Sequence, residues 1–299
     1  MRVLISGSSG LVGTALMPVL TGNGHEVVRL VRSQPSPGAS EVRWDPEAGQ
    51  IDAAGLKGVD AGVHLAGESI AAGRWTGAKK ARILESRVKG TRLIAETLAG
   101  LNPVPKVLVG ASAVGYYGDR GEETLREESD SGSMFLSDVC RQWEAATEPA
   151  AAAGVRVVLL RSGIMLSATD GALPRLLTPF RLGVGGTLGS GKQFMSWIAI
   201  DDVVGVIMHA LTTEALRGPV NSVAPQPVTN REFTKTLGRV LGRPTLFPMP
   251  AFAARLAFGQ MADELLLASQ RVESARLLAS GFQFRFPDLE GALRHLLGK

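Results

Sequence analysis

The fold is decided near the start of the chain by the stretch Arg2-Val3-Leu4-Ile5-Ser6-Gly7-Ser8-Ser9-Gly10-Leu11-Val12-Gly13. Its apolar first part predicts a buried β-strand over residues 2–6, and an apolar helical pattern over residues 11–20 begins directly after it. Glycines at such a junction permit a tight turn, a close approach of backbone to a phosphate and close packing of helix on strand. The helix N-terminus presents N–H groups and partial positive charge to an anion. The stretch therefore predicts a dinucleotide-binding loop.

The spacing of the glycines is Gly-x-x-Gly-x-x-Gly, and this pattern by itself also fits an ordinary glycine turn. The strand before it, the helix after it and its N-terminal position favour the dinucleotide interpretation. We expect the following residues of the loop to contact the cofactor: Gly7, Ser9, Gly10, Leu11, Val12 and Gly13.

The end of the second predicted strand indicates which dinucleotide is bound. A carboxylate at this place would bind the ribose 2′-hydroxyl of NAD and repel the extra phosphate of NADP. The chain instead reads Leu30-Val31-Arg32-Ser33. A guanidinium here can pair with a 2′-phosphate and stack on adenine, so Arg32 favours NADP(H) over NAD(H). The alternative is that Arg32 is a solvated surface side chain.

Short Val, Leu and Ile runs alternate with longer amphipathic stretches over the first half of the chain, which is the α/β pattern. Continuous apolar strands are typical of a parallel sheet covered on both faces. We therefore predict an α/β, Rossmann-like doubly wound parallel sheet. Its strands are expected over residues 2–6, 26–31, 61–66, 106–111 and 155–160, with a further short strand through 41–44, and its helices over residues 11–20, 77–99 and 136–153.

After Gly163 the alternation stops. A glycine-rich stretch at residues 183–191, a predicted helix over residues 202–211 and Pro-rich segments near residues 224–227 and 243–250 follow. We expect residues 1–165 to form the NADP(H)-binding domain, with returning segments around 196–224. Residues 166–299 are expected to form a smaller, mostly helical region on the substrate side.

Composition excludes several classes of protein. Of the 299 residues 45% are hydrophobic and 20% charged, a globular profile, and the net charge of +4 comes from Lys and Arg spread along the chain. No nucleic-acid partner is therefore expected. No apolar run approaches the roughly 20 residues of a membrane span, so no membrane partner is expected either. Cys140 is the only cysteine and the four histidines are far apart, so we expect no disulfide, no metal site and a cytoplasmic location.

Several motifs resemble those of extended short-chain dehydrogenases/reductases and occur in the same order. They lie at residues 7–13, 64–67, 86–91, 117–118 and 198–202. The resemblance is closer to an atypical branch, the epimerase-family proteins that carry a C-terminal segment of unknown function. The motifs of that branch lie at residues 66–68, 74–75, 112–118, 143–144, 161–163, 189–191 and 281–282, so the resemblance covers essentially the whole chain.

The resemblance implies an NADP(H) site on a Rossmann-like sheet. Val31 and Arg32 would lie near the adenosine phosphate. The stretch at residues 162–164 would meet the nicotinamide carboxamide through Ile164, with an ordinary strand-to-loop turn as the alternative. Arg87 resembles a further cofactor contact, with a helix-surface charge as the alternative, and Glu68 would either face the cofactor or cap the following helix. The remaining residues placed along the cofactor are Leu65, Ala66, Gly67 and Ser112.

The sequence departs from the usual catalytic residues of this superfamily, in which a Tyr acts with a Lys four residues later on one helix. The only tyrosines are Tyr116 and Tyr117, and neither lies in a predicted helix. Aligning the predicted helix on Glu144 puts Leu136 in the tyrosine position and Cys140 in the lysine position. Neither side chain does that chemistry at its ordinary pKa. In the same frame Ala113 occupies the place of the usual catalytic Ser or Thr.

Three groups remain as catalytic candidates: Ser112 as a hydrogen-bond donor, Tyr116 or Tyr117 as an unusual acid, and Cys140 as a thiol. Cys140 on an apolar helix face is more typical of a small buried side chain, and Tyr117 is more typical of a structural aromatic at a strand end.

Two other motifs have structural alternatives to a functional role. The Arg74-Trp75 pair would line a substrate pocket or contact the start of a helix, and the Asp201-Asp202 pair is interpreted as a helix N-cap with a first-turn acid.

Two functions from different classes follow. The first is an NADP(H)-dependent oxidoreductase or epimerase-like enzyme that acts on a small molecule of unknown identity and handles the proton with an unusual group or water. The second is a catalytically silent NADP(H) sensor that kept the nucleotide site and lost the dyad. The sequence does not indicate an oligomeric state.

Overall fold

The computed structural model describes all 299 residues and is built on one eight-stranded sheet. Every neighbouring pair of its strands is parallel except the last, in which β4 is antiparallel to β3. The strands in spatial order are β12 (Gly218–Ser222), β8 (Arg156–Ser162), β6 (Val107–Ala113), β5 (Ala61–His64), β1 (Arg2–Ser6), β2 (Glu26–Val31), β3 (Glu41–Asp45) and β4 (Gln50–Ile51). The predicted α/β doubly wound class is confirmed.

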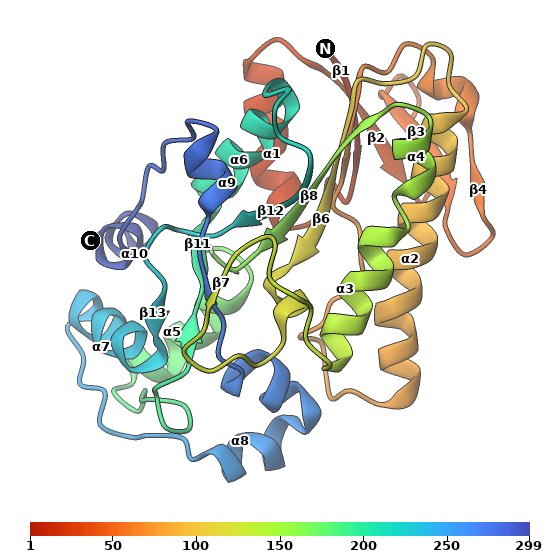
Figure 1. The fold of residues 1–299 in the computed structure, drawn as a ribbon. Helices are drawn as coiled ribbons and strands as arrows, with labels where there is room; N and C mark the ends of the chain where they lie inside the picture. Colours follow the sequence, from red (N-terminus) through yellow and green to blue (C-terminus); the bar gives the residue numbers. More distant parts are fainter.

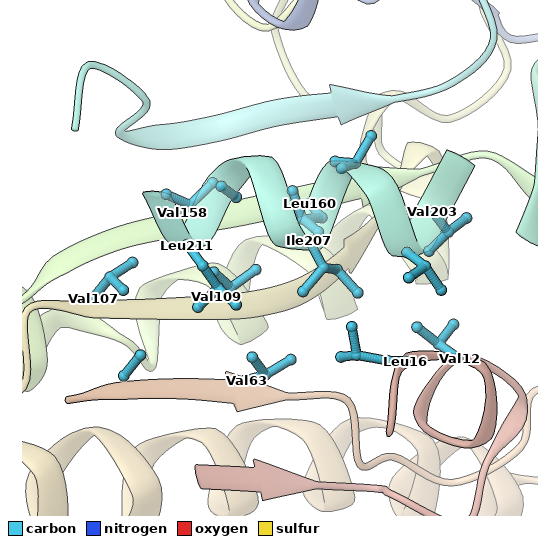
Figure 2. Packing of buried hydrophobic residues seen from close by; sticks show 14 of the residues in the cluster. Val12, Leu16, Val63, Val107, Val109, Val158, Leu160, Val203, Ile207 and Leu211 are labelled. Carbon is cyan, nitrogen blue, oxygen red and sulfur yellow. The ribbon is translucent and has the colours of Figure 1, made fainter. Parts of the chain in front are cut away.

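Helices cover both faces of the sheet (Figure 1). One face carries α1 (Leu11–Gly22) and α6 (Ile200–Thr212), and the other carries α2 (Gly77–Ala99), α3 (Phe135–Ala145) and α4 (Glu148–Ala152). Successive residues of β1 show why its sequence is continuously apolar. Val3 and Ile5 belong to the core cluster beneath α1 and α6, part of which Figure 2 shows around Leu16 and Ile207. Leu4 instead packs in the cluster beneath α2.

The helix predicted over residues 136–153 is two helices, which corrects that prediction. Pro149 lacks an N–H group, and its ring would collide with the carbonyl of residue 145 in a continuous helix. The chain therefore ends α3 at Ala145, turns at Ala146 and Thr147, and starts α4 at Glu148. Pro149 then lies in the first turn of α4, where a missing N–H group has no consequence.

The remaining elements lie mostly beside the sheet at the end where the parallel strands finish. A separate core joins three of the helices in this region to a small two-stranded sheet, and its largest side chains include Phe180, Trp197, Phe233 and Leu293. The strands are β7 (Thr124–Leu125), β9 (Ile164–Leu166), β10 (Phe194–Met195), β11 (Trp197–Ala199), β13 (Val228–Thr229) and β14 (Arg271–Val272), and the helices are α5 (Ala172–Arg181), α7 (Asn230–Leu241), α8 (Ala251–Phe258), α9 (Ala275–Ala279) and α10 (Leu289–Leu297). None of the helices is long and apolar enough to cross a lipid bilayer.

Asp201 and Asp202 lie in the first turn of α6, but neither is its N-cap, because the N-cap residue is Ala199. The buried Asp202 carboxylate instead accepts hydrogen bonds from the backbone N–H groups of Arg285 and Phe286, at 2.7 and 3.0 Å. The pair therefore has a structural role, as expected, but Asp202 holds the C-terminal segment against α6 rather than capping the helix.

The strand order changes direction beside β1. From β1 the chain proceeds through β2 and β3 to one side, and later from β5 through β6 and β8 to the other. Ligands of open α/β sheets bind at the carboxyl ends of the strands at such a switch point. The loops after β1 and β5 meet at this point.

Candidate functional site

The glycine-rich loop after β1 is packed so closely that two of its positions exclude any side chain. Gly7 has φ +72°, and a Cβ atom there would lie 2.8 Å from the backbone nitrogen of Ala66. A Cβ atom on Gly13 would lie 2.3 Å from the Gly7 carbonyl oxygen. The glycines thus bring the loop after β1 against the loop after β5, and the first turn of α1 against Gly7 and Ser8 of its own loop.

A buried Ser6–His64 pair holds these two loops together, and sequence reasoning missed it. The Ser6 hydroxyl accepts hydrogen bonds from the N–H groups of Leu65 and Ala66, and its oxygen lies 2.5 Å from His64 Nδ1. With its lone pairs engaged, the hydroxyl donates to the imidazole. Burial lowers the pKa of His64 to about 4, so the ring is neutral near pH 7.

The start of α1 is open to an anion. Its N-cap is Gly10, no side chain caps the first turn, and the turn contains no acidic residue. Its first N–H groups therefore lack partners within the helix. A pocket of about 460 Å³ adjoins this turn, lined on one side by Ser9, Gly10 and Leu11 and on the other by the loop at residues 167–170 and by His295.

The end of β2 carries an exposed Arg32, as the sequence predicts, and no hydrogen bond or ion pair within the protein involves its side chain. The nearby Arg29 is different, because its Nε donates to Ser8 Oγ at 3.1 Å and its Nη1 lies 3.2 Å from Glu41. Glu41 is thereby engaged with Arg29, which leaves Arg32 the free cation beside the glycine-rich loop.

Leu65, Ala66 and Gly67 follow β5 at the switch point and are partly or fully exposed. Glu68 does not cap α2, whose N-cap is Thr76. Its side chain is paired, because Lys79 Nζ lies 2.6 Å from Glu68 Oε1. The hydrogen bond from Lys79 lowers the pKa of the Glu68 carboxyl. The predicted alternative of a helix cap is therefore wrong for Glu68.

Arg87 is not a helix-surface charge, which excludes that alternative. Its Nη1 donates to the carbonyls of Glu68 and Ile83, at 3.0 and 3.1 Å, and its guanidinium lies over the Trp143 ring at 4.9 Å. Burial lowers the pKa of Arg87, so a bound anion would stabilise its charge. The side chain also lies against Gly67, where a Cβ atom would come within 3.3 Å of it.

A row of polar side chains crosses the carboxyl ends of β6, β8 and β12. Ser112, Arg161 and Asn221 are neighbours in register on the three strands. Glu144 reaches this row from α3, with its two oxygens 2.9 and 2.8 Å from Arg161 Nε and Nη2. The Ser112 hydroxyl donates to Glu144 Oε1 at 2.6 Å. The sequence analysis named Ser112 as a candidate and placed Glu144 and Arg161 in motifs, but it did not predict that the three side chains are in contact.

The two tyrosines have different surroundings. Tyr117 is fully buried, its hydroxyl donates to Asn221 Oδ1 at 2.7 Å and accepts from Arg161 Nη1, and burial raises its pKa to about 12. Tyr116 is partly exposed, its ring lies over the Arg161 guanidinium at 3.4 Å, and its hydroxyl makes no hydrogen bond within the protein. Tyr116 is thus free to meet a ligand, and Tyr117 is held in the interior.

Leu136 and Cys140 are both buried on α3. Burial, with Glu144 nearby, raises the pKa of the Cys140 thiol to about 12. The thiol is therefore a packing group in the interior and is neutral near pH 7, as its place on an apolar face predicts.

Two further predicted contacts are engaged within the protein. The Ile164 N–H group donates to the Ser196 carbonyl at 2.8 Å, which leaves the other atoms of Ile164 for a ligand. Trp75 precedes the N-cap of α2 and its indole donates to the Ile70 carbonyl at 2.7 Å, while Arg74 donates to the Leu256 carbonyl at the end of α8. The Arg74-Trp75 pair therefore holds the start of α2 against its neighbours.

Comparison with known proteins agrees with this architecture. The NAD dependent epimerase/dehydratase family matches residues 3–222, and a domain of unknown function, DUF1731, matches residues 249–296. An epimerase family protein of Mycobacterium bovis is 43% identical over 291 residues, which is 97% of this chain and 96% of the relative.

Two solved structures are similar over the whole chain. A crystal structure of the human epimerase family protein SDR39U1 with NADPH has a TM-score of 0.90 at 38% identity, covering 100% of this chain and 99% of that one. A nucleoside-diphosphate sugar epimerase from Corynebacterium glutamicum has a TM-score of 0.84 at 42% identity, and the match covers 100% of this chain and 58% of that one.

The match to the first family spans well over half of the chain, and the relatives match it nearly end to end. The resemblance predicted from the sequence motifs is confirmed, including the C-terminal segment. The chain is a member of the NAD dependent epimerase/dehydratase family that carries this additional segment.

Proposed function

We propose that the protein binds NADP(H) at the carboxyl ends of β1, β2 and β5 and is an oxidoreductase or epimerase-like enzyme acting on a small molecule. The observation that carries the proposal is the start of α1, which no side chain caps and which packs closely on its loop at Gly7 and Gly13. The unpaired Arg32 follows the neighbouring strand β2. A loop that excludes a Cβ atom fits a pyrophosphate approaching its backbone. The human relative crystallised with NADPH supports the choice of cofactor.

The residues present assign parts of the cofactor to parts of the site. The N–H groups at the start of α1 would hold the pyrophosphate, and Arg32 would hold the 2′-phosphate. Leu65 and Ala66 would lie along the nucleotide, and the neighbouring Arg87 side chain would supply a positive charge. When bound, a nicotinamide cofactor supplies or accepts a hydride.

Proton transfer in this proposal uses Ser112 and Tyr116 in place of the usual dyad. Because the Ser112 hydroxyl already donates to Glu144, it can accept a hydrogen bond from a substrate hydroxyl and pass its own proton to the carboxylate. Tyr116 has a free hydroxyl beside the same row and would donate to a substrate oxygen. Tyr117 is left out of the reaction because its hydroxyl is engaged on both sides.

The alternative of a catalytically silent NADP(H) sensor is favoured by one observation: the two dyad positions hold the buried Leu136 and Cys140, with the Cys140 pKa raised to about 12. A sensor would bind NADPH and NADP⁺ with different affinities and would change the surface beyond Pro225 on binding. Hydrogen exchange beyond Pro225 that is unaffected by either cofactor would contradict it.

The test is a titration of the purified protein with NADPH, NADP⁺ and NADH, followed by absorbance of the reduced nicotinamide while carbonyl compounds and nucleotide sugars are added. Selective NADPH binding with turnover of a panel member supports the enzyme. Selective binding with no turnover supports the sensor, and no selective binding of NADP(H) contradicts both. We propose a cytoplasmic location, which a lone buried cysteine fits.

A further inference from the structure

Large apolar side chains are exposed mainly in one part of the molecule. Eleven such side chains are exposed in the whole chain, and seven of them lie between residues 182 and 256. Four of the seven are more than 70% exposed. We call this set the apolar rim: Leu182, Val184, Leu246, Phe247, Met249, Phe252 and Leu256.

The residues of the apolar rim belong to two loops that run side by side and to α8. The backbone N–H of Met249 donates to Thr187 at 2.8 Å, and the N–H of Gly189 donates back to Met249 at 2.9 Å. Gly186 lies directly against the backbone of Phe247. On α8, Phe252 and Leu256 are four residues apart and therefore share one helix face. Figure 1 shows α8 and the connection from α7 at the end of the view away from the N-terminus.

The two segments that carry the apolar rim are basic, and the acids nearest to them in the sequence lie just beyond their ends. Residues 171–200 and 233–262 contain seven Lys or Arg residues and no Asp or Glu. Outside acids neutralise two of the seven, since Arg239 pairs with Glu290 and Arg255 with Asp263. Arg181, Lys192 and Arg243 are exposed and pair with no carboxylate. Because the whole chain carries only +4, these two segments are more positive than the rest of the chain taken together.

We infer that the apolar rim docks on the surface of an anionic lipid bilayer. Exposed Phe and Leu side chains flanked by Arg and Lys are typical of segments that lie in the interface of such a membrane. The docking is peripheral and needs no spanning segment, so it replaces the expectation of no membrane partner, which rested on the lack of a span. A symmetric contact with a second copy fits less well, because it would set two acid-free basic segments against each other.

The experiment is flotation of the full-length protein with vesicles of phosphatidylcholine alone and with vesicles that also contain phosphatidylglycerol. We expect binding only to the second kind, and binding at least about tenfold weaker in high salt, because basic residues near an anionic surface act through screened attraction. Failure of the folded protein to bind either kind, or equal binding to both, overturns the inference.

Two variants and two controls locate the contact. Phe247→Ser with Phe252→Ser removes apolar side chains, and Arg181→Glu with Arg243→Glu reverses charge. Each pair is expected to weaken vesicle binding about tenfold or more. The controls Leu278→Ser and Arg92→Glu change exposed residues on α9 and α2 and are expected to bind like the unchanged protein.

Thermal unfolding shows whether each variant is folded, and vesicle binding is compared between variants that are. Undiminished vesicle binding by either of the two double variants overturns the inference. Sedimentation that shows a dimer of the unchanged protein and monomers of the two double variants also overturns it, since the apolar rim would then be a contact between copies. Binding to an acidic protein or a nucleic acid as strong as to the anionic vesicles also overturns it.

Discussion

Ser112 on β6 and Glu144 on α3 are joined by a 2.6 Å hydrogen bond, and the same carboxylate is held by two nitrogens of Arg161. This bond links a hydroxyl to a carboxylate at the carboxyl ends of β6 and β8. The Arg161 side chain is 3% exposed and that of Glu144 11% exposed, so this ion pair is largely shielded from water.

Ser112→Ala and Tyr116→Phe are expected to lower turnover about 10²- to 10⁴-fold each while NADPH affinity changes little. Tyr116→Phe keeps the ring over Arg161 and removes only the hydroxyl, so it tests the hydroxyl alone. Steady-state kinetics with a substrate from the panel, together with cofactor titration, measure both effects. Unchanged turnover in a variant removes that residue from the proposed reaction.

Tyr117→Phe provides the contrast for Tyr116→Phe. Its hydroxyl is bonded to Asn221 and Arg161 in the interior, and loss of a buried partner costs about 1 to 3 kcal/mol. We expect a lower free energy of unfolding in urea with turnover per folded molecule retained. A fall in turnover as large as that of Tyr116→Phe would return Tyr117 to the list of catalytic candidates.

Arg32→Asp is expected to weaken NADPH binding about 10- to 100-fold, because it removes a charge-assisted contact and adds a carboxylate that repels the 2′-phosphate. NADH binding is expected to change far less. Fluorescence titration with both cofactors measures the ratio, and Arg92→Asp on the exposed face of α2 is the control for added negative charge. Equal losses for NADPH and NADH would contradict the assignment of Arg32.

Gly13→Ala is expected to destabilise the fold by about 1 to 3 kcal/mol and to weaken NADPH binding, since its Cβ atom would strike the Gly7 carbonyl oxygen. The matched control is Gly22→Ala at the other end of α1, where a Cβ atom meets nothing within 4 Å. That control is expected to be neutral or slightly stabilising. Urea unfolding of both variants decides, and equal stabilities would show that the loop can relax.

The free energy of unfolding is expected to decrease as the pH is lowered, because of His64. The unfolded imidazole takes up a proton near its ordinary pKa of 6.5, whereas the folded one does so only near 4. The unfolded state therefore binds more protons between these values, and about 2 kcal/mol of stability is lost between pH 7 and pH 5. Urea unfolding at both pH values should show this loss reduced in His64→Asn. An identical loss in the variant would assign the pH dependence to other groups.

Local signals in the sequence were sufficient for the parts of the fold that depend on near neighbours. The strands over residues 2–6 and 26–31 and the helix over residues 77–99 begin and end where predicted, because apolar periodicity and flanking glycines act within a few residues. The break between α3 and α4 was also local, and Pro149 was the signal for it.

The contacts of the candidate site were decided only in the tertiary structure. Ser112, Glu144 and Arg161 come from three elements, and nothing in their spacing shows that β6 and β8 are neighbours in register. The same holds for Ser6 with His64. By itself the sequence determined that a glycine-rich stretch lies between a strand and a helix, that an arginine rather than an acid follows the second strand, and that no lysine stands four residues after either tyrosine, because these depend on residue type and order. Which polar side chains lie side by side in the site depended on sheet order and helix packing. Only these bring residues that are distant in the sequence within hydrogen-bonding distance.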